Sequence, residues 1–163
     1  MIRGFRFLII GIVFVAASCS GDDNGDDAPA EPEISFEEQL DIDIALIDEY
    51  LATNNIEAEI HESGLRYVIN EQGEGEMPDA RSTVIVAYVG MFFDGEVFDQ
   101  SNNFEFNLST LIEGWRIGIP LINSGGSITL YIPSGYAYGS SGIPGNVDPN
   151  TNLIFDVSLL GVR

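Results

Sequence analysis

The chain contains 163 residues with a formal net charge of −20, and its six basic residues are all arginine. A protein this acidic repels phosphate backbones and anionic lipid headgroups, so no nucleic-acid partner is expected. Because Cys19 is its only cysteine, the chain can form no intramolecular disulfide.

Residues 1–18 are predicted to be an export signal. Arg3 and Arg6 precede the apolar run FLIIGIVFVAAS, which is shorter than the roughly 20 residues that a membrane-spanning helix needs. The sequence VAASC, which ends at Cys19, resembles the lipobox of bacterial lipoproteins. The resemblance implies cleavage before Cys19 and attachment of lipid to it. A plain secretory signal followed by an incidental thiol is the alternative.

Residues 19–34 are predicted to be an acidic, disordered tether. Nearly all of them are small, acidic or proline, and such a composition cannot bury a core. The acidic run is either a soluble spacer or, by resemblance, a surface-export tag of the kind found in some outer-membrane lipoproteins. We therefore expect a lipoprotein of the outer membrane, on its periplasmic face or at the cell surface.

Residues 35–62 are predicted to form an amphipathic helical segment. Ser35 and Glu38 have the spacing of a capping box, and TNN at 53–55 ends the helix. Apolar residues recur on one face at spacings of four, three and four: Leu40, Ile44, Ile47 and Leu51. We expect this face to pack against the downstream domain, and a seam between two copies is the alternative. His61 has no metal-ligating neighbour at a suitable spacing, so it is expected at the surface.

Residues 63–163 are predicted to form one domain in which strands dominate. Runs rich in β-branched and aromatic residues alternate with Gly, Asn, Asp and Pro clusters; these runs are GLRYVIN, STVIVAYVG, FEFNL, GSITLYI and NLIFDVSLL. The intervening segment TLIEGWRIGIPLI contains Gly114, Gly118 and Pro120, so it can form at most one short helix that depends on packing. The pattern predicts an α+β domain whose antiparallel sheet curls over that helix.

The residue types of the usual catalytic sites do not occur together in this domain. A serine-protease triad needs a histidine, and the only histidine, His61, precedes the domain. Asp94 precedes Gly95 in a hairpin-turn signal and Asp99 opens the polar loop DQSNN, so a two-carboxylate glycosidase site is not expected. Aromatic residues exceed what a sheet of this size needs, and some are expected to line an apolar ligand pocket.

Three segments of the domain resemble signature segments of the FKBP-type peptidyl-prolyl cis-trans isomerases: VAYVGMFFDGEVFDQS, LIEGWRIGI and YAYGSSGIPGNVDPNTNLIFDVSLL. The resemblance covers residues 64–163 in order. It implies a five- or six-stranded antiparallel half-barrel around one short helix. It also implies an isomerase without cofactor or metal that binds proline-containing segments of exported proteins, and FKBP-type macrolides as further ligands.

The resemblance also implies roles for individual residues. Trp115 is expected to form the pocket floor, the Tyr138 hydroxyl to bond a substrate carbonyl, and Asp99 to lie at the pocket edge. The implied catalytic set is Tyr88, Phe98, Asp99, Trp115, Tyr138 and Phe155, and the implied substrate-binding set is Phe104, Leu111, Ile112 and, on the loop rim, Val147.

Two positions depart from the family pattern. No arginine follows Asp99 to pair with it, and Ile143 stands where a histidine is common. Without that arginine, we expect a hydroxyl to hold the Asp99 carboxylate, and the resemblance implies that this hydroxyl belongs to Tyr88. A non-catalytic chaperone or adaptor that binds proline-containing segments is the alternative function, and a carbohydrate-binding lipoprotein with exposed aromatic rings is a third.

Overall fold

Residues 34–163 are described by the structure, which is a computed structural model. The predictions for earlier residues, namely the signal peptide 1–18, lipidation of Cys19 and the tether up to residue 33, lie outside the described residues. Within residues 34–163, no helix combines the length and the apolar character needed to cross a membrane.

The described chain consists of an N-terminal helix followed by strands and one further helix. The elements are α1 (Phe36–Thr53), β1 (Glu59–Ile60), β2 (Arg66–Glu71), β3 (Thr83–Met91), β4 (Val97–Asn107), α2 (Glu113–Gly118), β5 (Ser127–Ile132) and β6 (Leu153–Val162). A long segment between β5 and β6 contains the 3₁₀ turns Ser134–Tyr136 and Gly139–Ser141. The two-residue strand β1 was not predicted from the sequence.

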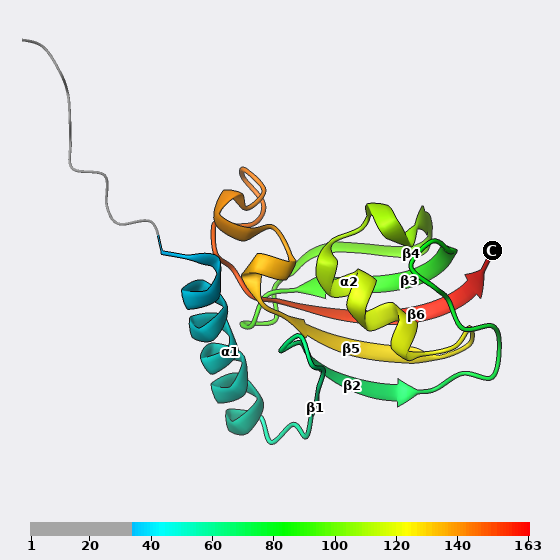
Figure 1. The fold of residues 1–163 in the computed structure, drawn as a ribbon, viewed down its shortest axis with the longest axis horizontal. Coiled ribbons are helices and arrows are strands. Elements are labelled where there is room, and N and C mark those ends of the chain that lie inside the picture. Colours follow the sequence, from blue (N-terminus) through cyan, green and yellow to red (C-terminus); the bar gives the residue numbers. More distant parts are fainter. Residues whose placement is uncertain (1–33) are drawn as a thin grey trace, which may run out of the picture. The chain divides into compact units, whose positions relative to one another are not determined.

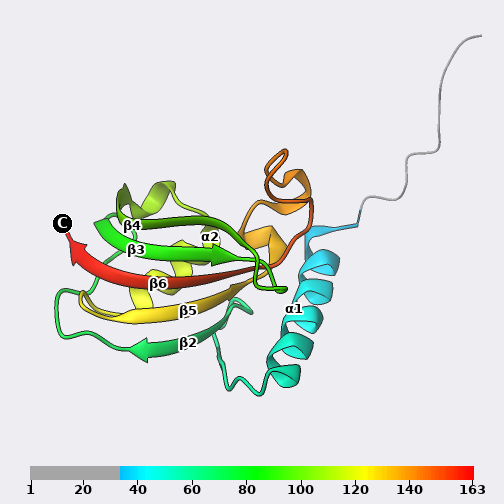
Figure 2. The same cartoon turned by 180° about the vertical axis from the view of Figure 1, so that it is seen from behind.

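The six strands form one antiparallel sheet in the order β1-β2-β5-β6-β3-β4. Two opposite views show that α2 lies across one face of this sheet (Figures 1 and 2). Strand β6 is central and pairs with both β5 and β3. The predicted α+β class, with an antiparallel sheet around one short helix, is confirmed.

Helix α2 packs closely on β5 because two of its residues are glycines. A Cβ atom at Gly114 would lie 2.5 Å from the Ile132 side chain, and one at Gly118 would clash with Leu130. The same glycines weaken the intrinsic helix propensity of this segment. Close packing on the sheet therefore requires the glycines, and the same packing stabilises the short helix. The helix in turn places the buried Trp115 over the sheet.

Helix α1 packs against the domain, as its apolar stripe predicted. Its capping box is present: the Ser35 hydroxyl accepts from the Glu38 amide at 3.2 Å, and the Glu38 carboxylate accepts from the Ser35 amide at 3.0 Å. Ile47 and Leu51 are buried in a cluster with Tyr131 of β5 and Ile154 of β6. The expectation that this face covers the downstream domain is therefore met within the described residues.

The prediction that a polar loop begins at Asp99 is wrong. Residues 97–107 form a continuous strand, in which Asp99 pairs with Gly90 and Ser101 with Tyr88 of β3. The strand was not recognised because its residues are polar. β4 lies at the edge of the sheet, where polar side chains remain exposed to water. The Asp94-Gly95 turn was predicted correctly: it joins β3 to β4, and Gly95 adopts φ of +88°.

Candidate active site

An apolar pocket of about 110 Å³ lies between the sheet and α2. Its walls come from β3, β4, α2, β6 and the β5–β6 segment. The lining residues are Tyr88, Asp99, Phe104, Leu111, Ile112, Trp115, Tyr138 and Phe155. All eight were predicted as site residues, so residues spread over 68 positions of sequence are brought together around one cavity.

Edge-to-face contacts between aromatic rings form the base of the pocket. The Trp115 ring meets Tyr88 at 5.0 Å and 80°, and Phe155 at 5.3 Å and 88°. Edge-to-face pairs of this kind stabilise by about 0.5–1.5 kcal/mol beyond the apolar area that they bury. Trp115 is 4% exposed and Phe155 2%. The predicted floor and wall are therefore well-packed core residues with a surface turned toward the cavity.

The pocket edge carries the predicted pair of Tyr88 and Asp99. The Tyr88 hydroxyl donates to Asp99 Oδ2 at 2.7 Å, so the prediction that Tyr88 restrains this carboxylate is confirmed. Register explains the contact, because β3 is paired with β4 from Gly90 opposite Asp99 to Tyr88 opposite Ser101. Burial raises the pKa of Tyr88 strongly, and its hydrogen bond to the negative Asp99 adds to the rise. The Tyr88 hydroxyl is consequently a protonated donor at neutral pH.

Tyr138 approaches the pocket from the segment between β5 and β6. Burial raises the pKa of its hydroxyl, and the nearby charge of Asp99 raises it further. Tyr138 therefore offers a neutral hydroxyl donor to the cavity that it lines.

A backbone donor is available at the start of α2. Ile112 is the N-cap residue, and its carbonyl accepts from the amides of Trp115 at 3.0 Å and Arg116 at 3.1 Å. The first four N–H groups of a helix have no acceptor within the helix, and the Ile112 amide is one of them. Ile112 and Leu111 both line the cavity, so this amide is a candidate donor to a bound carbonyl.

Two predicted site residues are not among those that line the cavity. Phe98 meets Phe155 edge-to-face at 5.6 Å and lies tilted against Phe92 at 5.2 Å, so it supports the Phe155 wall. Val147 is only 3% exposed and belongs to the main core cluster. The prediction that Val147 stands on the loop rim is corrected, because the β-bridge between Ile143 and Val147 folds the tip of the segment back and turns this side chain inward.

His61, which was expected at the surface, is partly exposed, and its Nδ1 accepts from the Ser63 amide at 3.1 Å. Across residues 34–163, no group of three or more His, Cys, Asp and Glu side chains is arranged to hold a metal ion.

Comparison with known proteins identifies the family. Residues 74–160 match the family described as FKBP-type peptidyl-prolyl cis-trans isomerase. The chain belongs to this family. The FKBP-type isomerase FkpA of Escherichia coli K12 is 44% identical over 105 residues, which are 62% of this chain and 38% of that protein. The outer membrane protein MIP of Legionella longbeachae is 32% identical over 143 residues, covering 84% of this chain and 61% of that protein.

Solved structures of FKBP-type proteins agree with this assignment. A peptidyl-prolyl cis-trans isomerase from Pseudomonas syringae superposes with a TM-score of 0.67 at 30% identity, covering 82% of this chain and 99% of that one. The crystal structure of Escherichia coli FkpA gives 0.68 at 38% identity, covering 78% of this chain and 62% of that one. The chain nevertheless spans only about two fifths of the length of the FkpA proteins that it matches in sequence.

The FKBP-type pocket of this chain holds its aspartate without an arginine. Three described arginines pair elsewhere: Arg66 with Asp48, Arg116 with Glu113 and Arg163 with Glu105. Tyr88 is the side chain that bonds Asp99.

Proposed function

We propose that the protein is a peptidyl-prolyl cis-trans isomerase that acts on proline-containing segments of exported proteins. The observation that carries the proposal is the aromatic pocket, lined by the eight residues given above, in a chain of the FKBP-type family. The proline ring would occupy the cavity over Trp115, with Phe104 and Phe155 as walls. Macrolides of the FKBP type are proposed as further ligands of the same cavity.

The pocket can accelerate isomerisation without a nucleophile or a cofactor because the reaction breaks no covalent bond. The X-Pro amide must twist through a state without resonance, over a barrier of roughly 18–20 kcal/mol. The planar amide is more charge-separated than the twisted one, so an apolar cavity favours the twisted state relative to water. Each 1.4 kcal/mol or so of this difference increases the rate about tenfold.

Two donors would orient the substrate in this pocket. The Tyr138 hydroxyl, kept neutral by its raised pKa, would bond one substrate carbonyl, and the Ile112 amide would bond another. Donors that are fixed before binding hold the substrate without the cost of ordering them when it binds. Asp99 would act at the pocket edge by fixing the Tyr88 ring, which in turn contacts Trp115 at 5.0 Å.

We also propose that the mature protein is a lipoprotein of the outer membrane, attached through lipid on Cys19. The lipobox-like sequence VAASC and the acidic residues that follow it support this proposal. One relative carries the name outer membrane protein MIP. Several acyl chains on Cys19 would give a firm anchor, because each buried CH₂ contributes about 0.8 kcal/mol. The pocket would then act on the periplasmic face or at the cell surface.

Refolding of a protein whose slow phase is limited by prolyl isomerisation tests the activity. The expected result is a slow-phase rate that rises in proportion to the concentration of this protein, without a change in amplitude. Binding of a proline-containing peptide should also change Trp115 fluorescence. Peptide binding without any increase in the refolding rate would favour the alternative, a chaperone or adaptor without useful turnover.

A further inference from the structure

A buried carboxyl group on α1 contacts the segment that carries Tyr138. The Asp43 side chain is completely buried, and α1 precedes the residues that match the family. Asp43 Oδ2 accepts from the Ser134 amide at 2.8 Å and from the Ser134 hydroxyl at 2.6 Å. Its other oxygen, Oδ1, accepts from Gln39 Nε2 at 2.8 Å. Among the hydrogen bonds of the described chain, this carboxyl group reaches only one residue outside α1. That residue is Ser134, the first of the 3₁₀ turn after β5.

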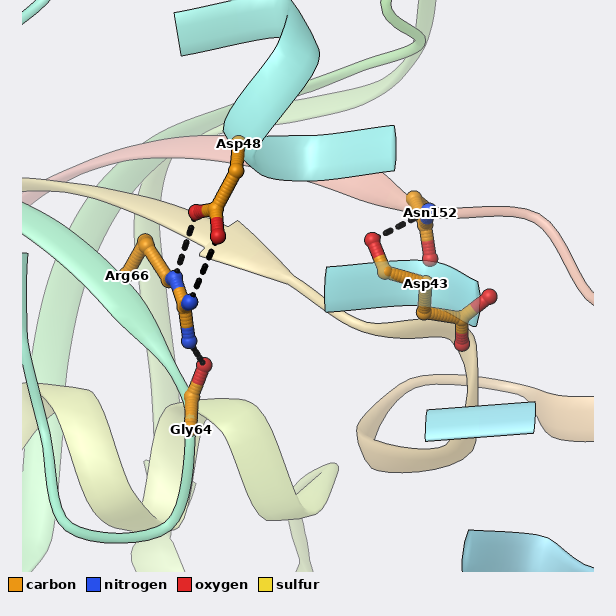
Figure 3. A network of polar contacts seen from close by, with 5 residues as sticks. All are labelled: Asp43, Asp48, Gly64, Arg66 and Asn152. Carbon is orange, nitrogen blue, oxygen red and sulfur yellow. Dashed lines mark hydrogen bonds and ion pairs between the residues drawn. The ribbon is translucent and has the colours of Figure 1, made fainter. Parts of the chain in front are cut away.

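The same network reaches the other end of this segment. Asn152 directly precedes β6, and its Nδ2 donates to the Asp43 carbonyl at 3.3 Å, as Figure 3 shows. Asn152 Oδ1 also accepts from the Ser134 amide at 2.9 Å. Asp43 therefore ties together the two ends of residues 134–152, which we call the substrate loop. Tyr138 lies within this loop and lines the pocket.

Further contacts place the start of the substrate loop against the N-terminal segment. The Phe36 ring of α1 lies 5.9 Å from the Tyr136 ring, and a Cβ atom at Gly135 would come within 2.6 Å of Phe36. The Tyr136 hydroxyl donates to the Ser63 carbonyl at 2.9 Å. Only Ala137 separates Tyr136 from Tyr138, so these contacts bear directly on where the Tyr138 hydroxyl lies.

A buried carboxyl group at position 43 costs more free energy than an apolar side chain would, so packing alone does not explain it. A buried carboxyl group is tolerated only when its hydrogen-bonding capacity is met, and an apolar side chain at position 43 would avoid that requirement. The helix has a separate polar attachment that does not touch the substrate loop: Asp48 accepts from Arg66 Nε and Nη2 of β2, each at 2.8 Å. Figure 3 shows Asp48 with Arg66 and, at another point of α1, the Asp43 carbonyl with Asn152.

We infer that the Asp43 side chain is a positioning residue for the isomerase pocket: through its carboxylate it holds Ser134 at the start of the substrate loop, so that the Tyr138 hydroxyl faces the bound peptide. The inference rests on the proposed isomerase function. If Asp43 has this role, α1 contributes to the isomerase site although the helix lies outside the matched residues 74–160.

Matched variants of the two attachments test the inference in the full-length protein. Asp43→Ala should raise KM for a peptide with a Leu-Pro bond about fivefold and change kcat less than twofold, because a misplaced Tyr138 weakens binding of the substrate and the transition state alike. Asp48→Ala, which loosens α1 without touching the loop, should leave KM within twofold of wild type even where it lowers the melting temperature equally. Asp43→Asn, which keeps an acceptor for Ser134, should recover most of the lost affinity.

A double-mutant cycle with Tyr138→Phe separates positioning from general loosening. If Asp43 acts through the Tyr138 hydroxyl, Asp43→Ala should add less than twofold to KM once that hydroxyl is gone. Amide hydrogen exchange should be faster at Ala137 and Gly142 in Asp43→Ala and unchanged there in Asp48→Ala. Should Asp43→Ala fail to fold, Ser134→Ala removes the 2.6 Å hydroxyl contact alone and should raise KM about twofold.

The results distinguish the failure of this inference from the failure of the proposed function. A wild-type protein without isomerase activity refutes the proposed function and the inference that rests on it. An active wild type with Asp43→Ala and Ser134→Ala unchanged in KM overturns the positioning role alone. Equal KM increases in Asp43→Ala and Asp48→Ala, or fully additive effects of Asp43→Ala and Tyr138→Phe, would also overturn it, because Asp43 would then only stabilise the fold.

Discussion

Replacing Asp99 by Leu removes the acceptor that fixes the Tyr88 hydroxyl at the pocket edge. A hydrogen bond to a charged group stabilises by about 1.5–3 kcal/mol. Because the Asp99 side chain is exposed, water can bond the freed hydroxyl in part, so the low end of that range applies. A loss of about 1.4 kcal/mol of transition-state stabilisation lowers kcat/KM about tenfold. The Tyr88 ring is 8% exposed and remains packed on Trp115, so the unfolding midpoint should change little.

Asp156 provides a matched control for this variant. It is an exposed aspartate on β6 that accepts a hydrogen bond from the Thr129 hydroxyl at 2.6 Å and does not line the pocket. Both variants should be assayed for isomerisation of a proline-containing peptide and for urea unfolding. Asp156→Leu should keep kcat/KM within twofold of wild type. Full activity in Asp99→Leu, with an unchanged unfolding midpoint, would remove Asp99 from the site.

Three further outcomes are expected. Phe155→Ala should lower the free energy of unfolding by about 3–5 kcal/mol and abolish activity, because Phe155 is a buried wall of the pocket. Phe106→Ala, on the exposed side of β4, should lower the free energy of unfolding by less than half of that amount. Equal losses in urea unfolding would contradict the core position of Phe155. The raised pKa of Tyr138 keeps its hydroxyl neutral in the folded protein, so kcat/KM should stay constant up to the ordinary tyrosine pKa of 10.0 and fall only above it; an alkaline midpoint below that value would refute the donor role. Cys19→Ser should release the protein from the membrane fraction, and retention there would argue against lipidation.

Most of the fold and of the pocket could be predicted from the sequence, because the patterns involved are either short-range spacings or family segments that occur in order along the chain. Ser35 and Glu38 lie three residues apart, and the capping box they form is determined by that spacing alone. The Tyr88–Asp99 pair was predicted from the family resemblance and the missing arginine, although the strand that contains Asp99 was not recognised.

Features that depend on distant parts of the chain could not be predicted. Asp43 lies beside the apolar stripe of α1 and would be assigned to solvent by residue type, yet its partners are 91 and 109 positions away, at Ser134 and Asn152. The inward position of Val147 follows from a bridge to Ile143 that residue type does not reveal. The strand at Asp99 was missed because an edge strand tolerates polar residues on its exposed positions.

Exchange spectroscopy by NMR tests the central claim most directly, because it measures interconversion of the cis and trans forms of a proline-containing peptide at equilibrium. The account predicts that catalytic amounts of the protein raise the exchange rate in proportion to their concentration, and that Tyr138→Phe weakens this effect. An exchange rate that stays at its uncatalysed value, at peptide concentrations that saturate the change in Trp115 fluorescence, would contradict it.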